Sequence, residues 1–354
     1  MQPGQSIIEP RDLILITGAT GFIGSRVVSN LLDRGFRNLR CFARHSSPQA
    51  MVEALSGYNR NGARVETVTG NLLSPEDCNA AARGAKVIFH LAAGTGEKSV
   101  PEAFRNSVVT TRNLLDACVR HDSVERFVNV SSFAVYSNRR TPRGRVLDES
   151  SPVEEHPERL TDAYSFAKIR QDELVFDYAK RHGLRYVIVR PGYVMIPGRN
   201  TITGRVGTDT FGLFLHLGGS NRIPFTFVDN CAEAIVLAGL TPGVEGEVFN
   251  VVDDNLPSSR QYLRQYKRNV RRFRSIYVPH FVSYALCWAW ERYSAWSEQQ
   301  VPPAFSRRVW HASWKKTRYS NAKLKRRLGW APAVPMSEGL RRYFEGCRNE
   351  EARA

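Results

Sequence analysis

Residues 13–24 read LILITGATGFIG, and this stretch decides the fold. Four apolar residues indicate a buried strand, the glycines at 18, 21 and 24 indicate a tight turn, and the residues that follow indicate an amphipathic helix. Glycines at this spacing permit unusual backbone angles and close packing of helix on sheet, while the helix N-terminus offers free amides to an anion. The stretch therefore predicts a strand, turn and helix that hold the pyrophosphate of a dinucleotide.

The same alternation continues along the first half of the chain, where short apolar, β-branched runs separate longer amphipathic stretches. This pattern is typical of βαβ units and a parallel sheet with helices on both faces. We predict helices at Phe22–Arg34, Val100–His121 and Asp162–His182. We predict strands at Leu13–Thr17, Leu39–Ala43, Val65–Thr69, Val87–Leu91, Phe127–Val130 and Tyr186–Val189. The fold class is then α/β, a Rossmann-type doubly wound parallel sheet.

The alternation weakens after residue 190, where the Gly, Pro and aromatic content rises. We predict that residues 1–190 form mainly the nucleotide-binding domain and residues 191–354 mainly a smaller, mixed substrate-binding lobe. A helix after Val228 and a strand at 247–252 predict that segments of about 225–255 return to the first domain. Residues 139–159, rich in Pro, Arg and Glu, are expected to form a loop, either a lid over the site or a plain surface excursion.

Composition limits the partners. Fifty Lys and Arg against 34 Asp and Glu give a formal charge of +16, which favours nucleotides, phosphorylated substrates or acidic lipid surfaces. No nucleic-acid-binding module accompanies the charge, so we expect no nucleic-acid partner. The six cysteines are scattered without a C-x-x-C pair and the eight histidines lack metal-ligand spacing, so we expect no metal and a reducing, cytoplasmic setting. The first residues lack the pattern of a secretory signal, and no apolar run is long enough to span a bilayer.

The end of the second predicted strand discriminates between dinucleotides. An acidic residue there would bind the ribose 2′-hydroxyl of NAD, but residues 41–47 read CFARHSS, with a cation and hydroxyls instead. Arg44 suits a 2′-phosphate, so NADP is favoured and NAD stays open. Solvation of Arg44, or stacking on adenine, is the alternative.

Tyr164 and Lys168 lie four residues apart within a predicted helix, so both side chains share one face, a turn apart. An ammonium beside a phenol favours the phenolate and lowers the phenol pKa from about 10. Tyr164 is therefore a candidate acid or base. A Tyr and a Lys at helical spacing are more often neighbours on a protein surface than catalytic residues. A catalytic role for this pair is therefore inferred only together with the other motifs.

Taken together, the motifs resemble those of the extended short-chain dehydrogenase/reductase family, of the epimerase/dehydratase type. The resemblance covers most of the chain. It depends on the glycine turn, VSSFAVY at 130–136, YSFAK at 164–168, HLAA at 90–93, RPG at 190–192, VDN at 228–230 and LGWAP at 328–332.

The resemblance implies a catalytic set of Ser132, Tyr164 and Lys168. Tyr164 would transfer the hydroxyl proton, Lys168 would bind the nicotinamide ribose and lower the tyrosine pKa, and Ser132 would bind the reacting oxygen while hydride passes to or from the nicotinamide. The residues expected to bind the cofactor are Gly18, Thr20, Gly21, Phe22, Ile23, Gly24, Arg44, Asn71, Leu72, Leu91, Ala92, Ala93, Tyr164, Lys168, Pro191 and Val194.

Three departures from the family pattern bear on chemistry. Asn71 stands where an Asp usually contacts adenine, and its side-chain carbonyl can still accept from an amino group. Ser107 stands where a supporting Asn is common, with Asn106 adjacent. The segment after Ser132 lacks the Thr-Asp-Glu of the dehydratases, so a 4,6-dehydratase is disfavoured.

The segment 281–290 reads FVSYALCWAW and lies between arginine-rich stretches. Basic residues around an aromatic amphipathic helix can lie on an anionic bilayer surface. The alternative, which we favour, is a lobe helix packed on the substrate cleft with solvated basic faces around it. Arg205, Arg222 and Arg260 are candidates to clamp a substrate diphosphate, or are surface residues.

The leading hypothesis is an NAD(P)-dependent oxidoreductase acting at a carbinol or ketone carbon of a small-molecule, nucleotide-sugar-like substrate. Three alternatives stay open: a nucleotide-sugar 4-epimerase, an enzyme similar to 3β-hydroxysteroid dehydrogenase at a membrane surface, and a non-enzymatic NADP-sensing regulatory module. A homodimer and a peripheral contact with an anionic membrane stay open as well.

Overall fold

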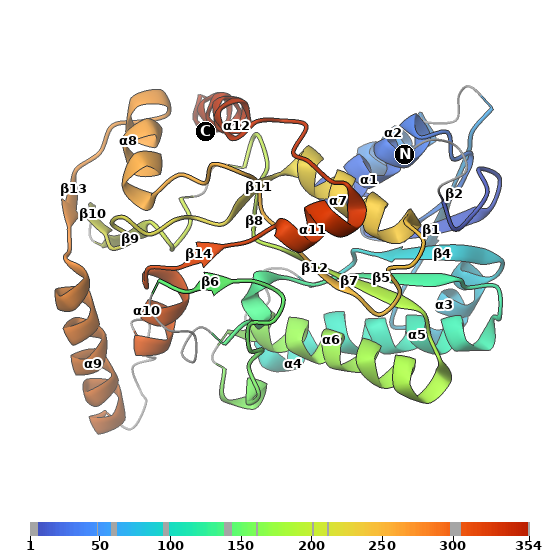
Figure 1. Ribbon diagram of the computed structural model, residues 1–354, viewed down its shortest axis with the longest axis horizontal. Coiled ribbons are helices and arrows are strands. Elements are labelled where there is room, and N and C mark those ends of the chain that lie inside the picture. Colours follow the sequence, from blue (N-terminus) through green and yellow to red (C-terminus); the bar gives the residue numbers. More distant parts are fainter. Residues whose placement is uncertain are drawn as a thin grey trace.

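The computed structural model describes residues 6–47, 49–57, 62–94, 99–137, 144–160, 162–199, 202–210, 212–297 and 306–352. Across these residues, seven parallel strands form the central sheet (Figure 1). In their order across it they are β12 (Val248–Val251), β7 (Tyr186–Pro191), β5 (Arg126–Val130), β4 (Ala85–His90), β1 (Leu13–Thr17), β2 (Asn38–Arg44) and β3 (Arg64–Gly70). The predicted doubly wound α/β fold is confirmed, and the chain order reverses beside β1, where such sheets bind ligands.

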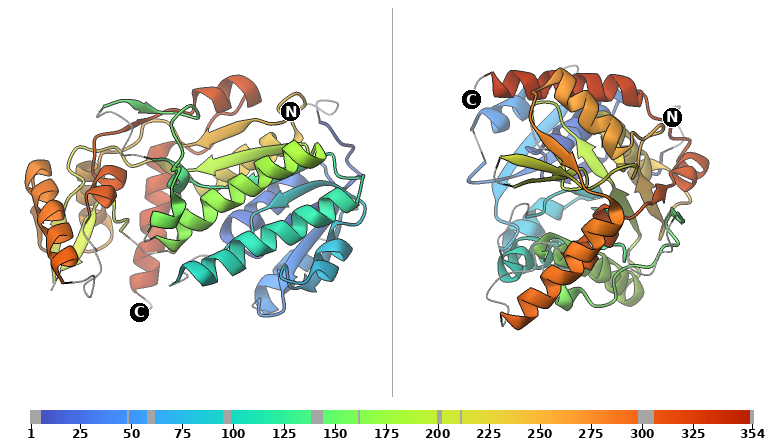
Figure 2. Two further views of the ribbon diagram at one scale, coloured as in Figure 1. Left: turned by 90° about the horizontal axis from the view of Figure 1, so that it is seen from below. Right: turned by 90° about the vertical axis from the view of Figure 1, so that its left-hand side faces the viewer.

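Helices cover both faces of the sheet, because its strands are apolar on both sides. On one face α1 (Phe22–Asp33) packs beside α7 (Val228–Leu240); on the other α5 (Thr110–Arg120) lies between α3 (Pro75–Ala82) and α6 (Ala163–His182) (Figures 1 and 2). A short helix, α2 (Gln49–Ser56), connects β2 to β3. Each face has its own buried apolar cluster.

The expected helix at 100–121 is interrupted. It consists of α4 (Val100–Ala103), a π-helical segment at Phe104–Val109, and α5. Side-chain hydroxyls accompany the wider turn: Thr110 Oγ1 donates to the Asn106 carbonyl at 3.0 Å, and Thr111 Oγ1 to the Ser107 carbonyl at 2.6 Å. Hydroxyls that bond the preceding turn commonly bend helices, and π-helical segments often lie at functional sites.

The C-terminal part of the chain builds a smaller lobe beyond the carboxyl ends of the main strands. Its core is aromatic, with Phe225, Tyr262 and Phe344 in mutual contact. Its sheets are β13-β10-β9 (Ser275–Tyr277, Leu213–His216, Gly207–Thr210), β11-β8 (Phe225–Phe227, Tyr193–Met195) and β14-β6 (Arg318–Tyr319, Val146–Leu147), and its helices are α8 (Ser259–Asn269), α9 (His280–Trp296), α10 (Arg307–Ser313) and α12 (Met336–Glu351). Another helix, α11 (Ala322–Leu328), returns to pack on α7 and β12.

The expected loop at 139–159 is described only from residue 144, and its earlier part lies outside the described residues. The described part contains β6 and a 3-10 turn at Pro157–Arg159. Among the described helices, none is long and apolar enough to cross a membrane.

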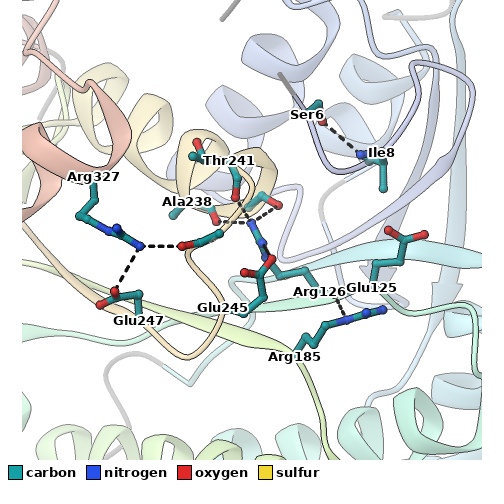
Figure 3. A network of polar contacts seen from close by, with 12 residues as sticks. Ser6, Ile8, Glu125, Arg126, Arg185, Ala238, Thr241, Glu245, Glu247 and Arg327 are labelled. Atoms are coloured by element: carbon teal, nitrogen blue, oxygen red, sulfur yellow. Dashed lines mark hydrogen bonds and ion pairs between the residues drawn. The ribbon is translucent and has the colours of Figure 1, made fainter. Parts of the chain in front are cut away.

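A buried arginine joins the main sheet to its covering helix. Arg126, at the start of β5, is fully buried and donates to the carbonyls of Ala238 and Thr241 at the end of α7, at 3.2 and 2.6 Å. Its guanidinium also pairs with Glu245 (Figure 3). The acceptors and the carboxylate compensate the cost of burying this charge, and they fix the end of α7 against β5.

Candidate active site

The glycine turn between β1 and α1 is built without room for side chains. Gly18 has φ of +72°, and a Cβ there would lie 2.9 Å from the Ala92 nitrogen. A Cβ on Gly24 would overlap the carbonyl oxygen of Gly18. The first glycine therefore meets a conformational need, and the third lets α1 approach β1 closely.

The N-terminus of α1 is open to an anion. Its N-cap is Gly21, no side chain caps the first amides, and the first turn holds no acidic residue. Unsatisfied amides and the positive end of the helix dipole together favour a phosphate. This arrangement fits the pyrophosphate of a dinucleotide.

A cavity of about 410 Å³ extends from this helix end over the carboxyl ends of the strands. Of the residues predicted to bind the cofactor, it is lined by Gly18, Thr20, Gly21, Phe22, Ile23, Gly24, Arg44, Asn71, Leu72, Leu91, Ala92 and Ala93. Tyr164, Lys168, Pro191 and Val194 do not line it. Pro191 is the buried end of β7, and Val194 lies in β8 and packs against the apolar clusters.

The cavity also has lining residues that the motifs did not single out. They are Phe42, Ser47, Leu73, Gly94, Asn106, Thr110, Val130, Ile196 and Arg199. Phe42 and Val130 lie near the carboxyl ends of β2 and β5, and Ser47, Leu73 and Gly94 lie in the loops after β2, β3 and β4, so the position at a strand end is a signal that could have identified these five. Asn106 and Thr110 come from the interrupted helix at 100–120. Ile196 and Arg199 arrive from beyond β8, without any local motif.

Arg44 and Arg199 supply the positive charge of the cavity. Both side chains are exposed, and neither guanidinium has a hydrogen bond or ion pair with the described residues. The Arg44 backbone is held in a tight turn by Ser47, whose Oγ accepts from the Arg44 nitrogen at 3.2 Å. Two cations not paired within the protein suit the phosphates of a nucleotide.

Asn71 lines the same cavity, and its side chain supports the local turn. Its Oδ1 accepts from the Leu73 nitrogen at 3.0 Å, while its own nitrogen donates to Asp77 at 2.7 Å. A carbonyl oxygen has a second lone pair, so an adenine amino group can still be accepted.

His90 forms part of a buried hydrogen-bond network beside the cavity. Its Nδ1 bonds Thr17 Oγ1 at 2.8 Å and its Nε2 bonds Thr111 Oγ1 at 2.9 Å. Thr17 Oγ1 in turn accepts from the nitrogen of Ala92, a lining residue, at 3.3 Å. Burial lowers the pKa of His90 to about 3, with Lys168 contributing in the same direction. His90 is thus a neutral hydrogen-bonding residue.

Ser132, Tyr164 and Lys168 come together at the start of α6. The Ser132 side chain acts on the Tyr164 phenol and lowers its pKa, and the Lys168 ammonium lies 6.0 Å from the centroid of the Tyr164 ring. Lys168 Nζ donates to the Val130 carbonyl at 2.7 Å, and Val130 lines the nucleotide cavity. Asp162 caps α6 by accepting from the nitrogens of Tyr164 and Ser165, which fixes the first turn and with it the tyrosine.

One expectation about this group is wrong. Burial raises the pKa of Tyr164, and the hydrogen bond with Ser132 lowers it only in part; Lys168 is not among the causes. Burial also lowers the pKa of Lys168 to about 8, against the attraction of Asp172. Desolvation of both groups outweighs their mutual effect, and the raised pKa favours the neutral phenol of Tyr164.

Asp172 is the buried centre of the contacts behind this group. Its carboxylate accepts from Asn129 and Ser131 at 2.9 Å each, and from Arg190 at 3.0 Å. It lies one turn after Lys168 on α6. These hydrogen bonds attach α6 to β5 and β7. They therefore fix the position of α6 and, with it, the position of Lys168.

The proposed diphosphate clamp does not assemble. Arg205 donates to the Ala312 carbonyl at 2.8 Å and to Tyr319 at 3.3 Å. Arg222 donates to the Leu256 carbonyl, and Arg260 stacks on Tyr277. Arg222 and Arg260 share a separate surface cavity that none of the catalytic residues lines.

Comparison with known proteins agrees with this geometry. Residues 14–251 match the family described as the NAD dependent epimerase/dehydratase family. The chain is 27% identical over 353 residues to 3beta-hydroxysteroid-dehydrogenase/decarboxylase isoform 2 of Arabidopsis thaliana, a match that covers 94% of this chain and 61% of that relative's length. It is 26% identical over 339 residues to 2-alkyl-3-oxoalkanoate reductase of Stenotrophomonas maltophilia, covering 93% of this chain and 97% of the relative.

Among solved structures, the UDP-glucuronic acid 4-epimerase of Bacillus cereus in complex with NAD is similar with a TM-score of 0.70 and 20% identity, over 95% of this chain and 99% of that one. At this identity the likeness establishes the fold alone.

Proposed function

The chain belongs to the NAD dependent epimerase/dehydratase family, and on that premise we propose that it is an NADP-preferring oxidoreductase that reduces a ketone, or oxidises the corresponding alcohol. One observation carries the proposal. The Lys168 ammonium lies 6.0 Å from the centroid of the Tyr164 ring, whose pKa the Ser132 side chain lowers, and it donates at 2.7 Å to the carbonyl of Val130, a residue of the cavity wall.

The side chains divide the chemistry between them. A nicotinamide, when bound, supplies or accepts the hydride. Tyr164 donates the proton to the carbonyl oxygen during reduction, because burial keeps its phenol protonated. Ser132 holds that oxygen by a hydrogen bond. Lys168, whose ammonium donates to the Val130 carbonyl in the cavity wall, would bind the cofactor's ribose and restore the proton to Tyr164.

The preference for NADP rests on Arg44. Its side chain is exposed at the cavity and its guanidinium makes no hydrogen bond or ion pair with the described residues. Charge-assisted hydrogen bonds to a phosphate are worth about 1.5–3 kcal/mol. We expect Arg44→Ala to weaken NADPH binding roughly 10- to 100-fold and NADH binding less than about threefold. Titration of both nucleotides against nicotinamide fluorescence measures this, and NADH serves as the internal control. Equal losses for both nucleotides would count against NADP.

As the substrate we propose an apolar ketone or a hydroxysteroid in preference to a nucleotide sugar. The relative from Stenotrophomonas that matches almost end to end is, by its name, an alkyl-oxoalkanoate reductase, and the Arabidopsis relative is a hydroxysteroid dehydrogenase. The arginines considered for a diphosphate are engaged elsewhere. A nucleotide-sugar 4-epimerase is the second candidate, supported by a relative from Azospirillum brasilense named UDP-glucose 4-epimerase, which is 30% identical over 218 residues, 58% of this chain.

A substrate screen tests this assignment. The protein is mixed with NADPH and, separately, with long-chain 3-oxo acids, 3-oxosteroids, simple ketones and UDP-sugars, and absorbance at the nicotinamide band is followed. We expect NADPH oxidation with the apolar ketones. Epimerisation of a UDP-sugar with a copurified, non-exchanging dinucleotide would point to the epimerase instead.

A further inference from the structure

Exposed apolar side chains gather in one segment of the small lobe. Among the described residues, twelve large apolar side chains are exposed, and eight of them lie between 276 and 296. Such a concentration marks a binding surface, whereas single exposed apolar residues are ordinary. The eight are Ile276, Tyr277, Phe281, Tyr284, Leu286, Trp288, Tyr293 and Trp296.

Helix α9 turns its aromatic side outward. Phe281, Trp288 and Trp296 are 77%, 49% and 79% exposed, and their spacing of seven and eight residues puts them on one helical face. The residues that α9 buries are Ser283, Cys287 and Ser294. Surface helices of soluble proteins ordinarily bury the apolar face and expose the polar one. Helix α9 does the opposite, because it buries small polar residues and exposes aromatic ones. We had expected this helix to pack its aromatic residues on the substrate cleft.

Packing on α10 fixes this orientation. The Trp310 indole donates to Ser283 Oγ at 2.9 Å, and Cys287 lies in a buried cluster with Trp310 and Trp314. Tyr284 meets the edge of Trp310 at 5.1 Å between centroids. Rotation of α9 to bury its aromatic face would break all of these contacts. Figures 1 and 2 show α9 at the end of the molecule remote from the main sheet, and the side chains of Phe281, Trp288 and Trp296 are exposed there.

The chain that leads into this surface is strongly cationic, on α8, on the segment between α8 and β13, and at Arg292 of α9. Residues 260–292 contain eight Lys or Arg and a single acid, Glu291. That acid is paired with Arg307 at 2.6 Å. Arg292, the cation on the aromatic face itself, stacks on Trp288 at 5.8 Å. The aromatic face therefore carries no unpaired negative charge of its own.

We propose that the outward face of α9, together with the edge strand β13, docks on an anionic lipid bilayer. Tyr and Trp favour the headgroup level, and cations near the surface are attracted to acidic lipids. The helix would lie flat, because none of the described helices can span a membrane. Charge favours lipid over a second copy of the chain, since pairing two copies face to face would bring the same cations together. The proposal is independent of the chemistry proposed for the active site.

Vesicle sedimentation of the full chain tests the proposal. The wild type is incubated with phosphatidylcholine vesicles and with vesicles containing one quarter phosphatidylserine, at low and high salt. The test variant replaces Phe281, Trp288 and Trp296 by Ser. The matched control is Phe176→Ser, which removes an aromatic side chain that is 39% exposed on α6, outside the patch. NADPH binding of each variant shows whether the fold is retained.

We expect the wild type and the control to sediment with the phosphatidylserine vesicles, less so at high salt, and the triple variant to bind at least about tenfold more weakly while still binding NADPH. Equal binding by the triple variant and the wild type would overturn the proposal. A wild-type dimer in sedimentation velocity that the triple variant abolishes, without vesicle binding, would also overturn it, because the face would then bind a second copy.

Discussion

His90 is completely enclosed, with a threonine hydroxyl on each ring nitrogen. Protonation of the ring would place a charge out of reach of water. Burial accordingly lowers its pKa to about 3, from an ordinary value of 6.5. Between pH 6.5 and pH 3, His90 is protonated in the unfolded chain and neutral in the folded protein. The free energy of unfolding therefore decreases as the pH falls below 6.5.

We predict that His90→Gln removes this acid sensitivity. Between pH 7 and 4.5 the wild type should lose about 2–3 kcal/mol of unfolding free energy through His90 alone. The variant, although less stable at pH 7, should lose that much less over the same interval. Urea unfolding at the two pH values measures the difference, and the other titrating groups cancel because both proteins share them. Parallel losses in the two proteins would contradict the assignment.

Some site residues could be predicted from sequence and others could not. Tyr164 and Lys168 share a helix, and Gly18 to Gly24 share a turn, so local spacing is enough to group them. Arg199 enters the cavity from beyond β8, and only the tertiary fold brings it there. The sign of the Tyr164 pKa shift was also missed, because the extent of burial cannot be seen in the spacing of two side chains.

At the scale of elements, α1 packs so closely on the end of β1 that Gly24, the third glycine of the turn, has no room for a side chain. We predict that Gly24→Ala pushes α1 off the Gly18 carbonyl, lowers the unfolding free energy by about 1–3 kcal/mol and weakens dinucleotide binding sharply. Ser25→Ala, one residue on, is the control. Thermal unfolding and NADPH titration report the two effects. Wild-type affinity in Gly24→Ala would show that the close approach is not needed.

Element positions follow from sequence wherever the periodicity is strong. The predicted strand at Leu13–Thr17 and the end of α6 before Gly183 agree with the structure. The π-helical segment at Phe104–Val109 could not be predicted, because it keeps a helical pattern while adding a residue to the turn. The outward face of α9 could not be predicted either, since periodicity identifies an apolar stripe but not the side on which its partner lies.

At the scale of the molecule, the site is assembled from distant parts of the chain. The glycine turn opens the first βα unit, Ser132 follows β5, and the tyrosine and lysine come from α6, which Asp172 ties to β5 and β7. The small lobe adds Arg199 and carries the aromatic face of α9 away from the cavity. Because these parts are separate, the functions proposed for the cavity, for Tyr164 and for the outward face of α9 can each be tested by its own variants.

The central claim is that Tyr164 transfers the proton without holding the dinucleotide. Its direct test is a paired measurement on Tyr164→Phe: NADPH affinity by fluorescence titration, and NADPH oxidation with the best ketone from the screen. Tyr178→Phe on the same helix, which loses only a surface hydrogen bond to Asp116, is the control. We predict that Tyr164→Phe binds NADPH within about threefold of the wild type and turns over on the order of 10²- to 10⁴-fold more slowly, while Tyr178→Phe matches the wild type. Wild-type turnover in Tyr164→Phe would contradict the account.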